Sequence, residues 1–492
     1  MLTRLHVKGF KNLVDTEVHF GPFTCIAGAN AVGKSNLFDA SRFLSLLANG
    51  KLDEAGRAIR AEGAKNADIK SLFTRNADGS LGVMEFDLDM IVPPTASDDL
   101  RQEASATITF LNYKVRLGYR TNSDDRRRSG ELELLSEDLS YIRPSSAKKQ
   151  LGFPCSDDWL KSAIHGIKTS KLISTQGVDG QMIVTLHMDG LSKTRANNHK
   201  RGVGYKRLAS QLPRTVLSAA DADSPTVLCA RAEMRGWEMV QLEPSAMRES
   251  DSLHQAPGIS PGGAHMAATL FDLGRAGVDP DPDAAYQRVG NKLSELIGDV
   301  GSVRVDVDEK RELLTICLVD RYGAETSARS LSDGTLSFIA LVLKQMETHP
   351  QRLICMEEPE NGIHPKRIAS ILNLLRDTAV DTFIPVDESN PLRQVIINTH
   401  SPAVVQQVPD DSLLVAEVLP WRDSTGARSA RFSVSSFDNT WRTKHFPNYR
   451  VTSKGSVLAY LRPAGKDERE PGDRKIVRVV DRPDLEQLLL PL

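Results

Sequence analysis

A glycine-rich stretch near the start of the chain, residues 28–35, fits the pattern GxxxxGK[ST]. Glycines let such a loop wrap closely around phosphate, with its N–H groups pointing inward. Lys34 would then bridge the β- and γ-phosphates of a nucleotide, and the Ser35 hydroxyl would ligate Mg²⁺. The alternative is an incidental glycine-rich turn, but an apolar run precedes the stretch and a helical pattern follows it, as a phosphate loop requires. The residues expected at the phosphates are Gly28, Asn30, Gly33, Lys34, Ser35 and Asn36.

Two adjacent carboxylates follow a second short apolar run. Glu357 and Glu358 come directly after residues 353–356, whose side chains are typical of a buried strand. A carboxylate at the end of such a strand can reach a Mg²⁺ held beside a phosphate loop, and the next one can polarise an attacking water. Taken alone, the pair also suits a solvated helix start, where acidic residues are favoured electrostatically. Because the chain also carries a phosphate loop, we expect Glu357 at the metal and Glu358 at the water.

Two further segments carry polar residues that could touch a nucleotide. Ser332 and Gly334 lie at the start of a run with helical spacing, so Ser332 is predicted to cap that helix. Capping and function are compatible, because an open helix N-terminus also receives phosphate. His400 follows the apolar run 395–397 and could sense the γ-phosphate, although a histidine in such a place is often an ordinary polar residue.

The spacing of these segments indicates a site assembled from distant parts of the chain. Residues 35 and 331 are separated by 331 − 35 = 296 positions, whereas the last three segments lie between residues 330 and 401. A nucleotide at the phosphate loop would already be contacted by the lysine and the carboxylates of the same chain. We therefore expect the second anion receptor, at Ser332 and Gly334, to face another copy of the chain.

The elements that must position these residues alternate between strands and helices. Residues 2–27 are predicted to form three strands, and residues 37–47 a helix. The other predicted strands lie near 83–88, 106–111, 115–119, 132–134, 303–307, 313–319, 353–356 and 394–398, and the other predicted helices span 335–346 and 366–377. Residues 150–300 show no heptad sustained over three repeats, which argues against a long coiled-coil arm. The fold class is α/β with a mixed central sheet and flanking helices.

Composition places the chain among globular proteins. It has 492 residues, of which 40% are hydrophobic and 26% charged, enough for roughly two to four domains. The formal net charge of −2 means that nucleic-acid contact would need a local basic patch. Five scattered cysteines without a CxxC pair indicate buried thiols in a reduced, cytoplasmic protein. We expect no membrane segment, because no run approaches about 18 apolar residues, and no signal peptide.

The four segments resemble the head of ABC-class ATPases, and more narrowly the branch that contains the RecF and structural-maintenance-of-chromosomes (SMC) heads and the OLD-like, AAA_21-type ATPases. In this resemblance residues 28–35 match Walker A, 331–335 the signature motif and 354–358 Walker B. Glu357 stands where the metal-side aspartate usually is, and Glu358 where the catalytic glutamate is. Residues 360–365 match the D-loop region and His400 the switch histidine.

The resemblance implies ATP and Mg²⁺ as cofactors and a homodimer or higher oligomer with nucleotide sandwiched between heads. It covers residues 1–50 and 300–405 strongly, and residues 241–270 look weakly like the connector of such ATPases. No glutamine can be assigned to the Q-loop, since Gln102 lacks a strand context. No acidic constellation of a TOPRIM nuclease, which OLD enzymes carry, follows His400. A nuclease or toxin would then be a separate partner, as in bacterial anti-phage systems of similar arrangement.

Basic side chains gather between residues 193 and 207, with Tyr205 among them. DNA or RNA binding through phosphate contacts is one interpretation of this cluster, and a solvated loop is the other. The candidate nucleic-acid contacts are Lys193, Arg195, Lys200, Arg201, Lys206 and Arg207.

The sequence thus predicts an ATP-hydrolysing dimeric switch, with Glu358 and His400 as catalytic residues, that acts on a partner effector or nucleic acid in defence against phage. The alternatives are an ATP-bound scaffold that restrains a toxin or nuclease, a DNA-repair ATPase and, more weakly, an autonomous nuclease or a transporter subunit. The predicted domains are an N-terminal ATPase lobe (1–150), an insertion (151–300), a C-terminal ATPase lobe (301–420) and a C-terminal extension (421–492).

Overall fold

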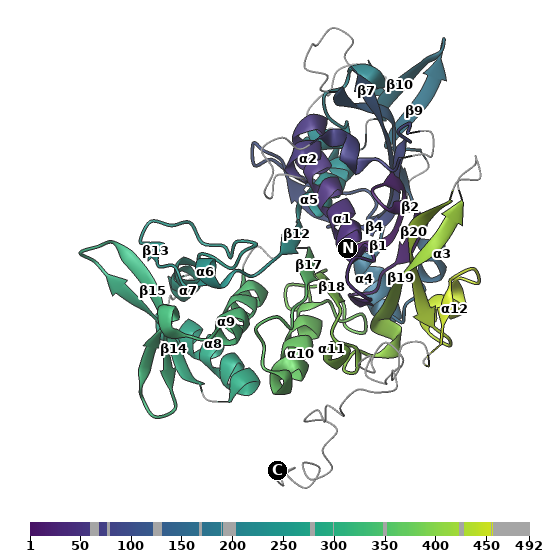
Figure 1. Cartoon of the computed structure of the whole chain (residues 1–492). Coiled ribbons are helices and arrows are strands. Elements are labelled where there is room, and N and C mark those ends of the chain that lie inside the picture. The colour runs from purple at the N-terminus through teal and green to yellow at the C-terminus, as the bar shows by residue number, and fades with distance from the viewer. Residues whose placement is uncertain are drawn as a thin grey trace, which may run out of the picture. The chain divides into compact units, whose positions relative to one another are not determined.

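The structure is a computed structural model that describes residues 1–59, 68–75, 79–121, 130–166, 170–187, 189, 203–275, 281–298, 300–347, 352–422, 428–453 and 455. Residues 1–453 form one compact unit, in which helices and strands alternate along the chain (Figure 1). The predicted α/β class is confirmed. Residues 454–492 form a second unit that lies, apart from residue 455, outside the described part.

A seven-stranded sheet carries most of the predicted site. Its order is β12 (Trp237–Val240), β17 (Leu353–Glu357), β18 (Gln394–Thr399), β3 (Phe23–Ala27), β19 (Leu413–Arg422), β20 (Arg428–Phe437) and β21 (Val451–Thr452). The strands from β12 to β19 are parallel, and β20 is antiparallel to β19, so the sheet is mixed as predicted. Every residue of β3 and β18 is buried, which is typical of parallel strands covered on both faces.

An antiparallel eight-stranded sheet forms the second layer. Its order is β11 (Val203–Leu208), β10 (Gln181–His187), β9 (Ile173–Val178), β8 (Gly130–Tyr141), β7 (Phe110–Thr121), β4 (Met84–Ile91), β1 (Leu2–Phe10) and β2 (Leu13–His19). The prediction of separate strands near 106–111 and 115–119 is wrong. β7 is one strand, because its pairing with β4 runs without interruption from Phe110 to Leu117.

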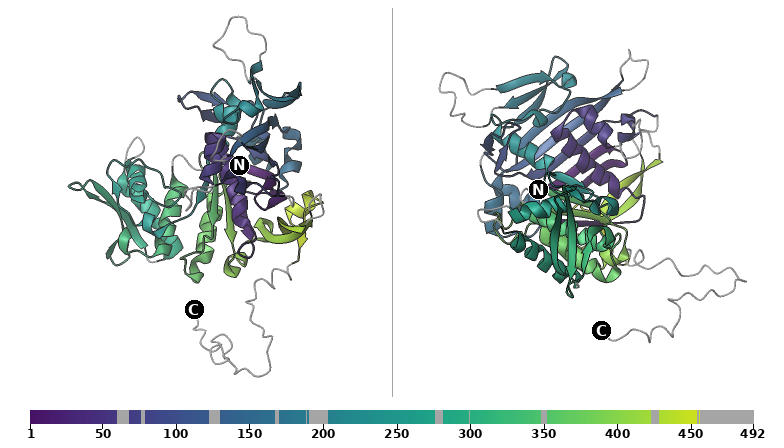
Figure 2. Two further views of the ribbon diagram at one scale, coloured as in Figure 1. Left: turned by 45° about the horizontal axis from the view of Figure 1, so that its top comes forward. Right: turned by 90° about the vertical axis from the view of Figure 1, so that its left-hand side faces the viewer.

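Helix α1 (Lys34–Asn49) links the two sheets through one hydrophobic core. That core contains Phe43 of α1, Phe86 of β4 and Ile396 of β18. The Phe43 ring stacks on Phe10 of β1 with 5.7 Å between centroids. Figure 2 shows α1, in purple, lying across the blue strands of the antiparallel sheet, beside α2 (Leu52–Ala58) and α5 (Pro225–Arg235). Both sheets therefore fix the helix that follows the phosphate loop.

A third group of elements lies between residues 244 and 346 and is termed the helical lobe. It contains α6 (Pro244–Met247), α7 (Met266–Arg275), α8 (Pro282–Ile297), α9 (Asp333–Met346) and a small sheet of β13 (Asp251–Ser252), β14 (Val300–Asp308), β15 (Leu313–Asp320) and β16 (Glu325–Ser327). The strands predicted near 303–307 and 313–319 are β14 and β15, which pair antiparallel. Helix α9 packs against α6, α7, α8 and α10 (Ile368–Thr378). The longest described helices, α1 and α8, have 16 residues each, so the described part contains no long coiled coil.

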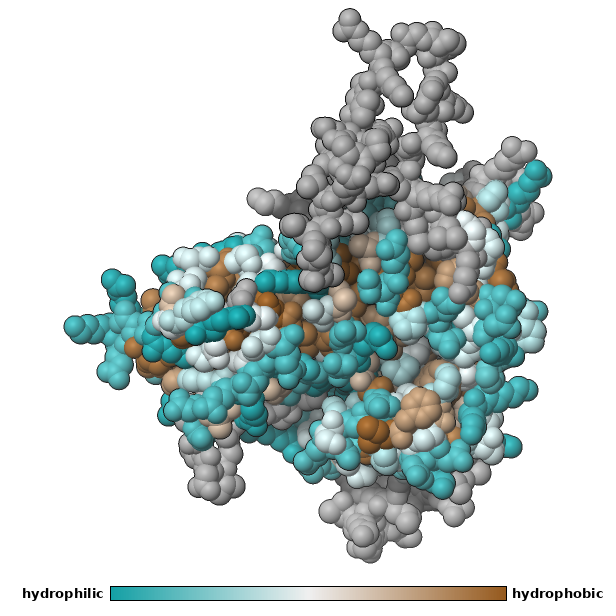
Figure 3. All heavy atoms as spheres, turned by 90° about the horizontal axis from the view of Figure 1, so that it is seen from below, coloured by the Kyte–Doolittle hydropathy of each residue, from teal (hydrophilic) through white to brown (hydrophobic). Residues whose placement is uncertain are grey.

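Shorter elements complete the described chain: β5 (Thr95–Ser97), β6 (Glu103–Ser105), α3 (Pro144–Leu151), α4 (Asp157–Ala163), α11 (Pro402–Val405) and α12 (Trp441–His445). Figure 3 shows one face of the molecule, on which hydrophilic side chains predominate between smaller hydrophobic patches. Among the described residues no helix has the length and apolar character needed to cross a bilayer.

A buried carboxyl group stabilises the junction between β8 and the chain before α5. Glu137 has no exposed surface, and its two carboxyl oxygens accept hydrogen bonds from Val216 N at 2.6 Å and Leu217 N at 2.8 Å. The Tyr113 hydroxyl donates a third at 3.1 Å. Burial raises the pKa of this carboxyl from 4.5 to about 7, against the lowering effect of these hydrogen bonds.

This raised pKa predicts a pH-dependent stability. Between pH 4.5 and about 7 the folded chain holds a proton that the unfolded chain releases, so the stabilisation is present below that range and is lost as pH rises through it. Relative to Glu137→Gln, the wild-type chain should lose on the order of 3 kcal/mol of unfolding free energy across this range. Urea unfolding of both proteins at pH 5 and pH 7.5 measures this, and a difference that does not change with pH would contradict it.

Candidate nucleotide-binding site

Four chain segments meet at the carboxyl edge of the parallel strands. β3 leads into the loop 28–33, β17 ends at Glu357, β18 leads to His400, and β12 leads to Gln241. The register pairs Ala27 with Thr399, Glu357 with Asn398, and Val240 with Met356. Ligands of open α/β sheets bind outside this edge. Parallel pairing thus brings together motifs that lie hundreds of residues apart.

The loop 28–33 ends at a helix start that is open to an anion. Gly33 is the N-cap of α1, no side chain caps the helix, and its first turn holds no acidic residue. Gly33 has a φ of 109°, and a Cβ there would lie 2.2 Å from Asn12 Nδ2, so only glycine fits. The unshielded N–H groups and the helix dipole favour phosphate at this point.

Lys34 is held by the loop that precedes it. Its Nζ donates hydrogen bonds to the carbonyl oxygens of Gly28 at 2.6 Å and Ala29 at 2.8 Å. Burial lowers the pKa of the Lys34 ammonium, while the negative charges of Glu358, Glu357 and Glu360 act in the opposite direction. The negative charges of three carboxylates thus act on the lysine of the loop. Ser35 and Asn30 are exposed beside it.

Asn12 supports the phosphate loop, a role that the sequence did not reveal. It lies in the turn between β1 and β2, where its Nδ2 donates to Val32 O at 3.2 Å. Its Oδ1 accepts from Asn36 Nδ2 at 2.8 Å. One side chain therefore ties the loop to the first turn of α1. Residue 12 lies within residues 1–50, which the family resemblance covers, but the resemblance gave this residue no function.

The two carboxylates after β17 are oriented by β18. Glu357 Oε1 accepts from Asn398 Nδ2 at 3.1 Å. Glu358 has a φ of 46°, a costly backbone conformation for a residue with a side chain, and its N–H donates to Asn398 O at 3.0 Å. Glu358 Oε1 lies 2.5 Å from His400 Nδ1, and Asn361 Nδ2 donates to Oε2 at 3.0 Å. The Glu358 side chain is thus held from two sides at the edge of the sheet.

Glu360 and Thr399 form a further polar contact at this edge. The Thr399 hydroxyl donates to Glu360 Oε1 at 2.5 Å, and the buried Glu360 Oε2 has no hydrogen-bond partner among the residues that the structure describes. Burial raises the pKa of the Glu360 carboxyl. The sequence placed residue 360 in the D-loop region and gave it no chemical role. The structure thus adds a third carboxylate to Glu357 and Glu358 at this edge.

Gln241 is a second residue at this edge that the sequence did not assign to the site. Its position fits the Q-loop glutamine better than that of Gln102. It directly follows β12, the parallel neighbour of β17, and it lines a pocket of about 320 Å³ together with Glu357, Glu358 and Asp333. Gln102 instead precedes β6, in a two-stranded sheet apart from this edge. The available signal was the short run over 237–240, in which three of four residues are apolar and which ends directly at a glutamine.

The signature segment belongs to the helical lobe. Ser332 is the N-cap of α9, as predicted, and its Oγ accepts from Thr335 N at 3.2 Å. Ser332 is exposed, whereas Gly334 is buried, and a Cβ on Gly334 would lie 3.0 Å from Gly362 O. Glycine at 334 thus allows α9 to approach the loop that follows Glu358.

The candidate nucleic-acid residues lie away from this edge or outside the described part. Lys206 and Arg207 are exposed on β11, the edge strand of the antiparallel sheet, and the Arg207 guanidinium lies 5.5 Å from the centre of the Tyr205 ring. Lys193, Arg195, Lys200 and Arg201 fall outside the described residues.

The donor set fits a magnesium nucleotide. Within the described ranges no group of three or more His, Cys, Asp or Glu side chains is arranged to hold a metal by itself. Mg²⁺ in nucleotide sites typically takes one or two protein oxygens and completes its shell with phosphate and water. The Glu357 carboxylate and the exposed Ser35 hydroxyl are suitable ligands of this kind.

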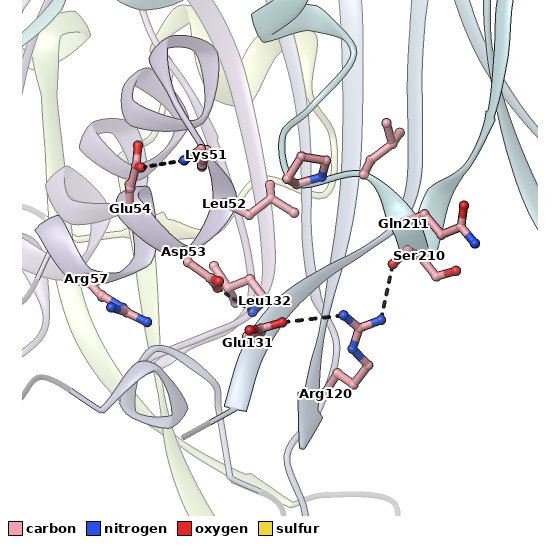
Figure 4. A pocket seen from close by; sticks show the side chains of 12 residues that line it. Lys51, Leu52, Asp53, Glu54, Arg57, Arg120, Glu131, Leu132, Ser210 and Gln211 are labelled. Atoms are coloured by element: carbon pink, nitrogen blue, oxygen red, sulfur yellow. Dashed lines mark hydrogen bonds and ion pairs between the residues drawn. The ribbon is translucent and has the colours of Figure 1, made fainter. Parts of the chain in front are cut away.

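A larger pocket, of about 610 Å³, lies beyond the far end of α1 between α2, β7 and β8 (Figure 4). Its charged side chains pair largely with one another: Arg120 lies 3.5 Å from Glu131 and donates to Ser210 O at 3.3 Å. Lys51 lies 3.4 Å from Glu54. The balanced charges offer no selective anion site, so size alone does not make this the nucleotide pocket.

Comparison with known proteins gives a partial match. Residues 275–406 match the AAA_21 family model, described as "AAA domain, putative AbiEii toxin, Type IV TA system". A stretch of 88 residues is 34% identical to the DNA replication and repair protein RecF of Synechocystis sp., and it covers 18% of this chain and 22% of that protein. The chain thus matches about a fifth of the length of this curated relative.

Solved SMC heads are also similar. The SMC head bound to the C-winged helix domain of ScpA has a TM-score of 0.43 at 13% identity, and covers 89% of this chain and 98% of that one. The SMC head of Pyrococcus furiosus with the C-terminal domain of ScpA has a TM-score of 0.39 at 13% identity, with 88% and 96% covered. The AAA_21 and RecF matches support an ATPase of the RecF type over the matched parts of the chain.

The position of Asn12 predicts a measurable effect on nucleotide affinity. Asn12→Ala removes the two hydrogen bonds that hold the loop to α1, so the affinity for an ATP analogue should fall roughly tenfold, a loss of about 1.4 kcal/mol. Titration of a fluorescent analogue measures this. Asn49→Ala, at the exposed opposite end of α1, is the matched control and should bind as the wild type does. Equal affinities for the two variants would exclude the role of Asn12.

Proposed function

We propose that the protein is an ATP-hydrolysing dimeric switch whose nucleotide-driven closure acts on a partner effector or on nucleic acid. The observation that carries this proposal is the convergence of the phosphate loop, Glu357, Glu358 and His400 at one sheet edge. A site for nucleotide binding alone would not need a second carboxylate, whose residue has a costly backbone conformation and whose side chain contacts a histidine.

In the proposed reaction each side chain has a distinct task. Lys34 and the first turn of α1 bind the β- and γ-phosphates, and Ser35 and Glu357 hold Mg²⁺, which neutralises phosphate charge when bound. Glu358 orients a water and accepts its proton as the water oxygen bonds to the γ-phosphorus in line with the leaving group, and the Pγ–O bond to ADP breaks to release phosphate. His400, next to Glu358 Oε1, keeps that carboxylate in place and lies where it can touch the γ-phosphate. Ser332 and the backbone at Gly334 of a second copy close over the γ-phosphate from the other side.

Gln241 connects the site of hydrolysis to the helical lobe, which is the part of the chain proposed to move. It lies beside the carboxylates at its β12 end and begins the chain that enters the helical lobe. A change at the γ-phosphate would therefore reach the lobe that carries Ser332. Head separation after hydrolysis follows from loss of the phosphate that joins the two copies.

The partner is proposed to be a separate nuclease or toxin in anti-phage defence. The matched family model is described with a toxin of a type IV toxin–antitoxin system, which supports this context. A repair ATPase that contacts DNA is the second candidate, and the RecF match favours it. Lys206 and Arg207, both exposed on β11, are the described residues that would contact nucleic acid in that case, and the Arg207 guanidinium lies over the Tyr205 ring.

Glu358→Gln tests the proposed mechanism. The amide keeps the shape of the side chain but cannot polarise water as a carboxylate does, so ATP should bind and remain uncleaved. We expect hydrolysis to fall at least ~100-fold and a stable ATP-dependent dimer to appear in light scattering.

Asp377→Asn, which alters an exposed acidic residue on α10, is the control and should leave turnover unchanged. A Glu358→Gln chain that stays monomeric with ATP and hydrolyses it normally would disprove the assignment. If the wild-type chain binds ATP but shows no turnover with or without DNA, the protein is instead a nucleotide-bound scaffold.

Charge reversal tests the nucleic-acid alternative. If the basic cluster contacts DNA, replacing Lys200, Arg201 and Lys206 by glutamate should abolish stimulation of the ATPase by DNA and leave basal turnover intact. Stimulation that persists unchanged in this variant would end the idea.

A further inference from the structure

The two helix starts proposed to contact phosphate differ in charge. α1 begins without an acidic residue in its first turn and without a capping side chain. α9 begins at Asp333 and is capped by Ser332. A carboxylate at the first helical position stabilises an isolated helix, but it repels an anion that approaches the same N-terminus. The signature end of α9 therefore needs a counter-charge if it is to receive a phosphate.

Arg248 supplies that counter-charge. Its Nη2 lies 2.5 Å from Asp333 Oδ1 and also donates to the carbonyl oxygen of Leu331 at 3.0 Å. One guanidinium nitrogen thus neutralises the carboxylate and fixes the turn that carries Ser332. The pair is only partly buried, with 31% of the Arg248 side chain and 48% of the Asp333 side chain exposed. A pair with this exposure contributes about 0–1 kcal/mol to stability, so folding alone gives little reason for it.

Arg248 also belongs to the segment that starts at the nucleotide edge. It follows α6 and lies seven positions after Gln241. Backbone hydrogen bonds from Gln241 N to Pro261 O and from Glu243 N to Gly262 O, each 2.9 Å, hold this segment in place. The far end of α9 is fixed to β12 as well, through the buried Lys344, which lies 2.7 Å from Glu238 and donates to Ile259 O at 3.0 Å. These contacts fix both the segment that carries Arg248 and the helix that carries Asp333, so the two side chains are held next to each other.

We propose that Arg248 is a positioning residue that neutralises Asp333, so that the N-terminus of α9 can receive the terminal phosphate of a nucleotide bound to a second copy of the chain. The proposal rests on the proposed dimeric switch and adds to it a charge requirement at the signature turn. Arg248 acts through Asp333 and Leu331. Its loss leaves the phosphate loop of its own chain unchanged.

The test is a charge cycle in the Glu358→Gln background, in which ATP should hold the dimer together. Arg248→Met should weaken the ATP-dependent dimer at least ~10-fold, because an unpaired Asp333 then faces the phosphate. Asp333→Asn added to Arg248→Met should restore dimer affinity to within about threefold of the parent, since the repelling charge is gone. Affinity of the Arg248→Met monomer for a fluorescent ATP analogue should equal that of its parent, since Arg248 is not one of the residues that line the pocket beside Glu357.

A matched control is Arg304→Met, which removes an arginine paired with Glu325 in the same lobe and should not alter dimer affinity. Two results would overturn the inference: Arg248→Met that dimerises like its parent, or a defect that Asp333→Asn does not rescue, which would mean a purely structural role. A Glu358→Gln parent that fails to dimerise with ATP would contradict the proposed function itself, and the inference with it.

Discussion

The parallel pairing of β18 with both β3 and β17 is the constraint on which the rest of the site depends. A one-residue shift of β18 would move Thr399 away from Ala27 and Asn398 away from Glu357, because side chains alternate between faces with a period of two. Every residue of β3 and β18 and four of the five residues of β17 are buried, so hydrophobic packing holds these three strands together. Because of this register, Asn398 positions both carboxylate residues. Its side chain donates to Glu357, and its carbonyl oxygen accepts a hydrogen bond from the N–H of Glu358.

Several negative charges lie close together at this edge of the sheet, and neighbouring residues hold their side chains in place. The negative charges of three carboxylates, Glu357, Glu358 and Glu360, act on one buried lysine. Each is held by a neighbour: Asn398, His400 and Thr399 respectively. Groups fixed in this way need little reorganisation when a charged ligand arrives, which is how phosphoryl-transfer sites gain most of their rate. The strained backbone at Glu358 is consistent with a residue placed for chemistry rather than for stability.

The sequence predicted those features that follow from local pattern. Apolar runs ending in Gly28, Glu357 and His400 gave the strands of the parallel sheet, and helical spacing gave α1 and α9. It could not reveal Asn12 or Asn398, whose roles are hydrogen bonds made across the fold. Gln241 was missed because β12 has four residues, too few for a period to emerge. For β7 the sequence predicted two strands where the structure has one. A local break in the apolar alternation does not interrupt the strand, because its pairing with β4 is continuous.

The central claim is that one nucleotide site is shared between two copies of the chain, and mixing two inactive variants tests it most directly. Lys34→Ala disables the phosphate loop and Ser332→Arg blocks the signature turn, so each variant alone should hydrolyse no ATP. In a mixture, the intact phosphate loop of one chain can meet the intact Ser332 of the other, and about a quarter of wild-type turnover should return, since half of random dimers are mixed and each holds one intact site. Turnover that remains at the level of the separate variants would contradict a shared site.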